Sequence, residues 1–410
     1  MYYIYIYIMG GGLMQLVAYG AQDVYLTGNP QITFFKTVYK RHTNFSMEHI
    51  QQTFKGNPGA GARVIATISR NGDLVHDCYL KAVCKGDSVT HNPGHAIIDN
   101  IECQIGGQLI DRQYGQWMET HAELTEKGVN NETTVLDAMK VGSQNAAQKN
   151  PTTFQLTAGA GGVYSASFSD TNLYVPLRFW FNRHVGLSLP LIALQYHEVN
   201  IIVKFTSQAD ATKFTPIELW ANYIYLDTDE RRRFAQVSHE YLIEQVQLQE
   251  FSKASATTSY SYKLNFNHPV KELIWIQSLL EWGSDGSTSN SVGSVPSLLY
   301  KNTTTAQLKL NGHDRFAAQT IDYFTRYQVL KYHSTSCAKS SYIDAIAVYS
   351  FALKPEEHQP SGTCNFSRID SAQLLFENFV TGFNQTIYVY AVNYNVLRIM
   401  SGMGGLAYSN

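Results

Sequence analysis

Apolar and polar residues alternate with a period of two along most of the chain. The clearest stretches are residues 199–205, 217–225 and 260–266. This period puts apolar side chains on one face of an extended segment, which predicts half-buried β-strands. Shorter apolar runs predict further strands at residues 63–68, 74–84, 97–105, 306–310, 342–353 and 387–394. One sheet cannot hold so many strands, so the pattern predicts an all-β chain with two sandwiches.

A repeated sequence pattern supports a division into two similar halves. Residues 103–112 (CQIGGQLIDR) and 308–315 (LKLNGHDR) both read as a strand, a glycine turn and an Asp-Arg pair. Gly107 and Gly312 are 205 residues apart, which is too far for a solenoid repeat and favours a duplicated domain. The boundary is expected where Asp227, an N-cap candidate, and an acidic first turn begin a short helix.

Residues 349–370 (YSFALKPEEHQPSGTCNFSRID) have the chemistry of a corner between two strands. Pro355 and Pro360 fix their φ angles and cannot donate to a sheet ladder. Ser361 and Gly362 then allow a sharp reversal of the backbone. We therefore expect the chain to leave one strand here and enter another, with residues 364–370 extended.

The sequence of residues 349–370 closely resembles a signature of the major capsid proteins of large icosahedral double-stranded DNA viruses. These belong to the nucleocytoplasmic group, which includes the chlorella viruses (phycodnaviruses). The resemblance extends over residues 15–45, 68–77, 101–117, 174–199, 222–247, 264–273, 308–317 and 393–410. It fades at residues 1–8, 127–170 and 283–304, of which the last two are polar and turn-rich and are expected to be solvated loops.

The resemblance implies an all-β fold of two consecutive eight-stranded jelly rolls, a double jelly roll, with short helices in loops and at the linker. The expected divisions are an N-terminal arm (1–42), a first jelly roll (43–226), a linker helix (227–240), a second jelly roll (241–397) and a C-terminal tail (398–410).

It also implies a structural major capsid protein that forms homotrimeric, pseudo-hexagonal capsomers of an icosahedral shell and is assembled in the host cytoplasm. The implied partners are further copies of the chain, minor capsid proteins and an inner viral membrane beneath the shell. No catalytic residue, cofactor or metal is implied. Two alternatives remain open: a minor or vertex capsid protein of the same fold, and a carbohydrate-binding β-sandwich, which the tyrosine and tryptophan content would suit.

Composition limits the partners. The formal net charge is −2, so the chain lacks the long-range attraction expected of a protein that packs DNA through its phosphates, and no direct nucleic-acid contact is expected. The five cysteines are odd in number and have no CxxC spacing, which indicates a reducing compartment. The apolar residues 1–9 lack a basic start and are too short to span a membrane. Met9 is a second candidate start.

Candidate binding motifs have plainer explanations. His91 and His95 with Asp99 come nearest to a metal cluster, but the intervening Pro-Gly pair favours a solvated turn. Residues 227–230 resemble the opening of a calcium loop without its glycine and closing glutamate, so helix capping is expected. The arginines at 231–233 are expected to pair with carboxylates. The glycine-rich residues 10–12 and 402–405 are expected to be flexible arms.

No GxSxG or HExxH motif occurs in the sequence, and no enzyme is expected. The histidines outside the 91–95 loop are expected in strands or turns without a partner that would make them a general base, namely His184, His197, His239, His313 and His358. Asn302 and Asn384 begin Asn-x-Thr acceptor patterns in polar stretches, so they are the candidate glycosylation sites on an outward surface.

Overall fold

The structure is a computed structural model that describes residues 11–85, 93–126, 171–278, 303–334, 346–379 and 385–408. It divides into two compact units, Met1–Asn44 and Phe45–Asn410. The first unit contains two short helices without buried residues, α1 (Gly11–Val17) and α2 (Val24–Thr27). Large apolar side chains of this unit are exposed, including Tyr25, Phe34 and Phe35.

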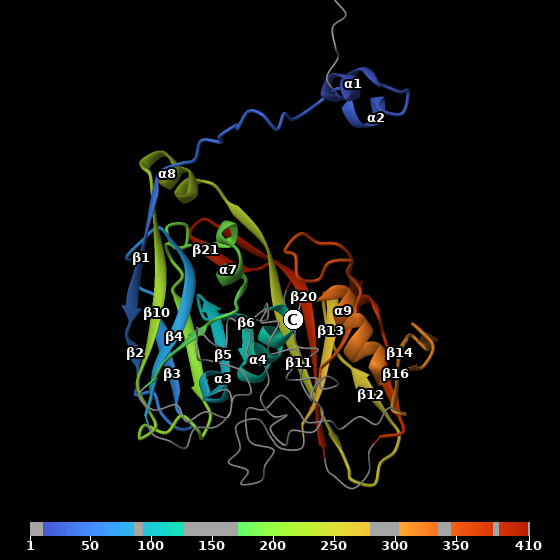
Figure 1. The fold of residues 1–410 in the computed structure, drawn as a ribbon. Helices are drawn as coiled ribbons and strands as arrows, with labels where there is room; N and C mark the ends of the chain where they lie inside the picture. The colour runs from blue at the N-terminus through green and yellow to red at the C-terminus, as the bar shows by residue number, and fades with distance from the viewer. Residues whose placement is uncertain are drawn as a thin grey trace, which may run out of the picture. The chain divides into compact units, whose positions relative to one another are not determined.

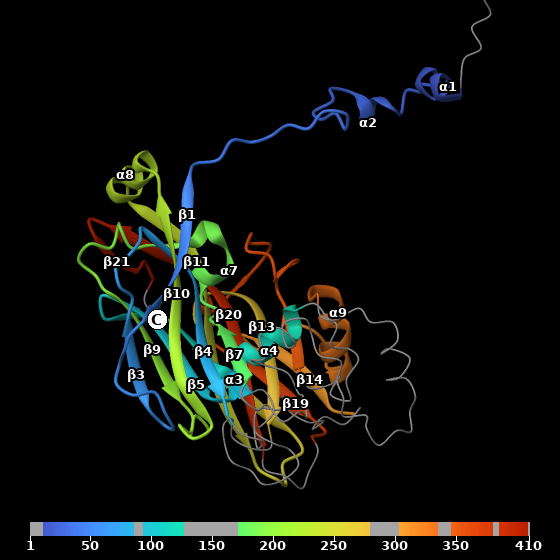
Figure 2. The same cartoon turned by 60° about the vertical axis from the view of Figure 1, so that its left-hand side comes forward.

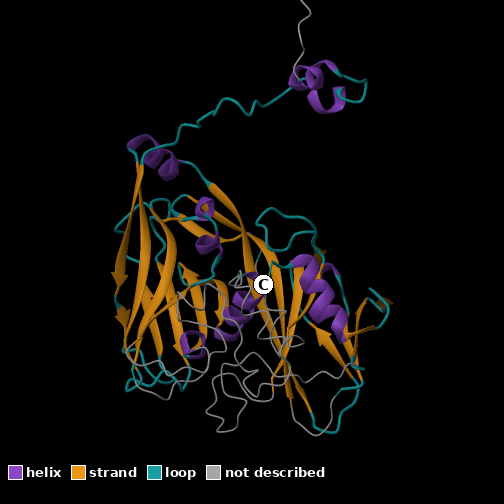
Figure 3. Ribbon diagram, viewed as in Figure 1, coloured by secondary structure: helices purple, strands orange, loops and turns teal. Residues whose placement is uncertain are grey.

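The second unit is built from antiparallel sheets (Figures 1 and 3), two of them from residues 45–226, which we call the first half. One has the order β1 (Phe45–Gln52), β10 (Phe214–Leu226), β4 (Leu74–Cys84) and β7 (Thr171–Pro176), with β8 (Leu189–Pro190) also paired to β4. The other has the order β2 (Phe54–Lys55), β3 (Arg63–Thr67), β9 (Val199–Phe205), β5 (Ile98–Ile105) and β6 (Gln108–Tyr114).

Residues 239–408, the second half, form the other two sheets. One has the order β11 (His239–Lys253), β20 (Gln385–Met400), β13 (Pro269–Ser278) and β17 (Ile346–Ser350), with β18 (Cys364–Asn365) and β21 (Met403–Leu406) at its margins. The other has the order β12 (Tyr260–Leu264), β19 (Ala372–Glu377), β14 (Thr305–Leu310) and β15 (His313–Asp314), with β16 (Gln319–Thr320) paired to β14.

Both halves repeat one topology. In each, the first strand pairs with the long strand near the end of the half, and that strand also pairs with a long strand from the middle: β1-β10-β4 and β11-β20-β13. Alternate side chains of the facing sheets fill the interior, as the period-two pattern requires. The predicted all-β double jelly roll is confirmed.

Short helices occupy the connections. They are α3 (Pro93–Ala96), α4 (Gly115–Thr125), α7 (Trp180–Arg183), η1 (Val185–Leu187), α8 (Thr228–Gln236), η2 (Tyr323–Tyr327), α9 (Gln328–Tyr332) and η4 (Phe366–Arg368). Asp227 takes the N-cap position of α8, as predicted, but its carboxylate makes no capping hydrogen bond. Nε of Arg231 lies 2.8 Å from Oδ1 of Asp73, so this arginine pairs with a carboxylate.

The C-terminal segment differs from the sequence expectation. Residues 402–405 are not a flexible arm, because β20 runs to Met400 and β21 returns antiparallel along it. The amide of Tyr196 donates to the carbonyl of Gly402 at 3.0 Å, and Nδ1 of His197 lies 3.0 Å from the carbonyl oxygen of Gly404. The edge of β20 satisfies the backbone groups of β21, so this segment is part of the fold and joins the second half to the first.

The corner at residues 351–362 folds back on itself. The amide of Leu353 donates to the carbonyl of Ser361 at 3.3 Å, and the amide of Lys354 donates to the Ser361 hydroxyl at 2.9 Å. Gly362 has φ of +137°, a conformation that favours glycine. Beyond it, β18 is short and gives way to η4, so the extended segment expected over residues 364–370 is wrong after Asn365.

Candidate functional site

The two halves meet on the face of sheet β11-β20-β13-β17 that points away from the second-half core. Trp275 points into that core, whereas its neighbour Ile274 belongs to the core cluster of the first half. The rings of Tyr390 and Trp117 have centroids 5.2 Å apart, and the Tyr390 hydroxyl donates to Oε1 of Gln116 at 2.9 Å. Helix α4 of the first half therefore covers the outer face of a second-half sheet (Figure 2).

A buried carboxylate joins cations from the two halves. Glu244 on β11 lies with Oε1 2.7 Å from Nζ of Lys271, and with Oε2 2.6 Å from Nη1 of Arg183 in α7. The side chains of Glu244 and Lys271 are only 6% and 3% exposed. A charge at such depth costs several kcal/mol unless it is paired, so each of these ions depends on the others.

A second buried ion cluster lies beside the first. Nδ1 of His333 is 3.1 Å from Oε1 of Glu356, and Nε2 is 3.3 Å from Oε2 of Glu272. Burial acts to lower the pKa of His333, but the hydrogen bonds and charges of the two carboxylates outweigh it and raise that pKa to about 9. His333 is therefore an imidazolium at neutral pH.

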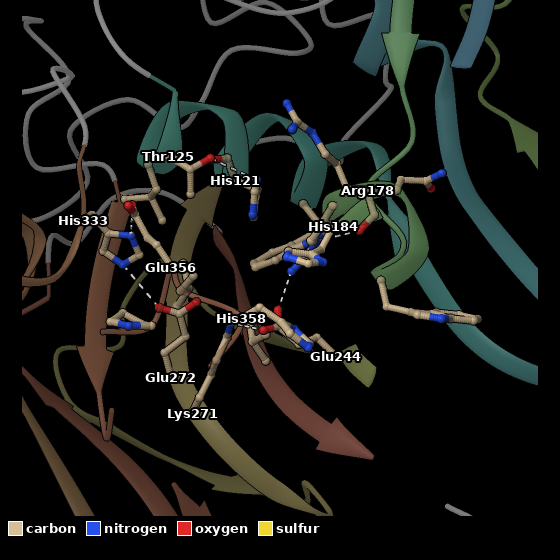
Figure 4. A pocket seen from close by; sticks show the side chains of 18 of the residues that line it. His121, Thr125, Arg178, His184, Glu244, Lys271, Glu272, His333, Glu356 and His358 are labelled. Atoms are coloured by element: carbon tan, nitrogen blue, oxygen red, sulfur yellow. Dashed lines mark hydrogen bonds and ion pairs between the residues drawn. The ribbon is translucent and has the colours of Figure 1, made fainter. Parts of the chain in front are cut away.

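A cavity of about 430 Å³ opens next to these clusters (Figure 4). His121 from α4, His184 and Arg178 line it from the first half, and His358 lines it from the second half. The rings of His184 and His358 are stacked with centroids 5.8 Å apart. Burial, followed by the charges of Arg183 and Arg178, holds the pKa of His121 well below its ordinary value. His121 is therefore a neutral imidazole at neutral pH.

This arrangement suits a structural junction better than a reaction centre. Within the part of the chain that the structure describes, no three His, Cys, Asp or Glu side chains are grouped to hold a metal ion. The charged groups around the cavity are largely paired with one another, three of the pairs within the second half and one, Arg183 with Glu244, between the halves. The Arg183–Glu244 pair helps to hold one half against the other. In the same described ranges, no helix is both long and apolar enough to cross a membrane.

The expected solvated turn at residues 91–95 is wrong at its described end. Pro93 takes the first position of the short helix α3, where its missing amide proton costs nothing. His95 is buried, and its Nδ1 lies 2.6 Å from Oε2 of Glu119 on α4. Asp99 instead pairs with Lys204 at 2.6 Å, so these groups do not converge on a metal. His91 lies outside the described residues.

The remaining histidines singled out in the sequence are dispersed. His184 and His358 line the cavity, while His197 contacts Gly404. His239 at the start of β11 has its Nε2 2.8 Å from the carbonyl oxygen of Phe234. His313 is exposed on β15.

The candidate glycosylation sites Asn302 and Asn384 lie outside the described residues, as does Cys337. Glycosylation therefore stays a prediction. Burial raises the pKa of the Cys78 thiol to about 12 and that of Cys103 well above its ordinary value. Thiols held in this way are poor nucleophiles.

Sequence reasoning missed the buried ion clusters. The one available signal was Lys271-Glu272, a charged pair at the start of the otherwise apolar strand β13. Glu244 lies 27 residues before Lys271, His333 lies 61 residues after Glu272, and Arg183 lies 61 residues before Glu244, so no local spacing connects them. Folding of the second half brings four of these side chains together, and packing of the first half adds Arg183.

Comparison with known proteins gives a consistent result. Residues 33–227 match the family model described as major capsid protein N-terminus, and residues 230–405 match that of the large eukaryotic DNA virus major capsid protein. The major capsid protein of Pyramimonas orientalis virus is 49% identical, and that of Paramecium bursaria Chlorella virus 1 is 41% identical. Each alignment covers 98% of this chain and 100% of the relative. The crystal structure of PBCV-1 VP54 superposes with a TM-score of 0.71 at 35% identity, covering 92% of this chain and all of that one.

Proposed function

Since the chain belongs to the family of large eukaryotic DNA virus major capsid proteins, we propose that it assembles as a homotrimer with a pseudo-hexagonal outline. The chain is a structural protein of the virion shell. Its relatives are named major capsid proteins, which favours this role over a minor or vertex capsid protein and over a carbohydrate-binding sandwich.

The repeated strand order in the two halves is the observation that carries the trimer proposal. Each chain supplies two similar barrels, so three chains supply six. A molecule with three-fold symmetry can then present nearly equivalent sides to six neighbours, which is what a hexagonal array requires. A monomer or a two-fold dimer of the same chain would not.

Sedimentation velocity of the purified chain tests this proposal. We expect one species with three times the chain mass of 46.1 kDa, unchanged on dilution through the micromolar range. Interfaces of an obligate oligomer typically bury on the order of 2,000 Å² or more, which accounts for resistance to dilution. A dilution-stable monomer at neutral pH and moderate salt would refute the trimer.

Further partners follow from the exposed surface and the charge. The arm exposes apolar side chains such as Phe34 and Phe35, which supports contact with minor capsid proteins or with an inner membrane beneath the shell. The net charge of −2 supports the absence of direct nucleic-acid contact. The cysteine usage supports assembly in the reducing host cytoplasm.

We propose no catalytic activity for the chain, in keeping with a structural role and with ions that are paired with one another. We also propose that Asn302 and Asn384 carry glycans on the outer surface. Intact-mass measurement of protein from purified virions tests the glycans. A mass equal to that of the bare chain would remove the glycans from the proposal.

A further inference from the structure

Two equivalent sheets of the chain differ in whether the other half covers their outer face. Sheet β11-β20-β13-β17 of the second half has its outer face covered by the first half, through α4 and β6. Val246 on β11, for example, donates its amide to Oδ1 of Asp111 on β6 at 3.2 Å. Its first-half equivalent, β1-β10-β4-β7, has the same strand order, but its outer face exposes His49 and Tyr174.

That face carries a row of aromatic rings. Tyr79 on β4 and Trp220 on β10 are cross-strand partners with parallel rings, their centroids 6.4 Å apart. His49 on β1 and Tyr174 on β7 flank Tyr79 with centroids 5.9 Å and 6.0 Å away. Tyr79 is the sixth residue of β4, as Ile274 is of β13, and Ile274 is buried at the junction of the halves. The aromatic row therefore lies where the second half has its covered junction.

The second half also has a counterpart of helix α4, the first-half element that covers its sheet. Helix α4 follows strands β5 and β6, and the η2–α9 segment follows β14, β15 and β16 at the same stage of the topology. Phe324 of η2 is buried and packs on Trp275 with centroids 5.2 Å apart, so the segment is anchored to its own barrel. Its other side exposes Tyr327 (52%) and Leu330 (82%).

The two surfaces face opposite ways. The aromatic face carries Glu218 beside its cross-strand partner Lys81, and the helical segment carries Lys331. Figure 1 shows β1 and β10 on the left-hand side of the second unit, with α9, β14 and β16 on the right-hand side. Surfaces so placed cannot meet within one chain, but they can meet between copies in a head-to-tail ring.

We infer that the aromatic face of sheet β1-β10-β4-β7 docks onto the η2–α9 segment of a second copy of this chain, around Tyr327 and Leu330. The contact repeats between chains the junction that α4 makes within one chain. It rests on the proposed homotrimer and specifies which surfaces close it. Each copy uses both surfaces once, so three contacts close the ring.

Two blocked variants test the assignment by sedimentation velocity. Trp220→Arg blocks the sheet, and Leu330→Arg blocks the helical segment. Each alone should shift the chain from trimer to monomer, whereas an equimolar mixture should form dimers, because one intact sheet and one intact helical segment remain available. Leu353→Arg is the matched control, since Leu353 is 76% exposed on a different loop and should leave the trimer intact.

Hydroxyl-radical footprinting of the unmodified chain gives a readout that does not depend on how the variants fold. Tyr79, Trp220 and Tyr327 should be at least severalfold less labelled in the trimer than their exposure in one chain predicts, while Leu353 should be labelled freely. A trimer retained in either blocked variant, a mixture that stays monomeric, or full labelling of the aromatic row overturns the docking surface. A monomeric unmodified chain would instead refute the trimer itself.

Discussion

Replacement of Gly362 by valine should destabilise the second half more than the same change at two other glycines. At φ of +137° a β-branched residue is strained, at a cost of about 1 to 3 kcal/mol. A Cβ added there would also lie 2.8 Å from the carbonyl oxygen of Phe351 and 3.4 Å from Cα of Ala352. Both are backbone atoms that cannot turn aside, so overpacking adds about 1 to 3 kcal/mol. We expect a total near 3 to 4 kcal/mol from these two costs.

Two control substitutions separate the contributions. Gly312 has φ of +80° with no heavy atom within 4 Å of an added Cβ, so Gly312→Val measures backbone strain alone and should cost about 1 to 2 kcal/mol. Gly59 has open space and no positive φ, so Gly59→Val should be nearly neutral. The order of destabilisation should be Gly362, then Gly312, then Gly59.

The assay is thermal unfolding at a fixed protein concentration, with trimer yield measured in parallel. An unfolding entropy of roughly 2.1 cal/mol/K per residue gives a shift on the order of 1 °C per kcal/mol for a folded unit of this size. Gly362→Val should therefore lower Tm by about 3 to 5 °C. Equal melting temperatures for the Gly362 and Gly59 variants would refute the prediction that Gly362 is required at the corner. Equal melting temperatures for Gly362→Val and Gly312→Val would show that the contact of the added side chain with Phe351 and Ala352 costs nothing.

The buried ions at the junction give two further predictions. Glu244→Gln should lower the free energy of unfolding by about 3 kcal/mol, because it leaves Lys271 and Arg183 without their carboxylate. The double variant Glu244→Gln/Lys271→Met should recover part of that loss in chemical denaturation. A loss in the double variant equal to the sum of the losses in the two single variants would contradict the coupling. His333 has a pKa raised from 6.5 to about 9, so its stabilising contribution is complete below pH 6.5 and lost as pH rises to 9. The free energy of unfolding should fall by about 3 kcal/mol across that window in the unmodified chain and not in His333→Gln. If the free energy of unfolding changed with pH equally in both proteins, the role of His333 would be disproved.

Local sequence was enough to predict much of the fold. The period-two alternation predicts strands such as β9 and β10, because in a half-buried sheet the side-chain direction reverses at every residue. Asp227 and its acidic neighbours predict α8, since capping and the helix dipole act within one turn. The proline and glycine residues around Gly362 predict a corner for the same local reason.

Tertiary structure decided everything that depends on contacts between distant segments. Residues 402–405 read as a flexible arm, yet they form a strand because the edge of β20 offers backbone partners. His95 read as part of a solvated turn, yet Glu119 buries and pairs it. The junction of Arg183, Glu244, Lys271, Glu272 and His333 has no local pattern, because a buried charge is stable only where packing supplies its opposite, and packing joins residues without regard to their spacing in the chain.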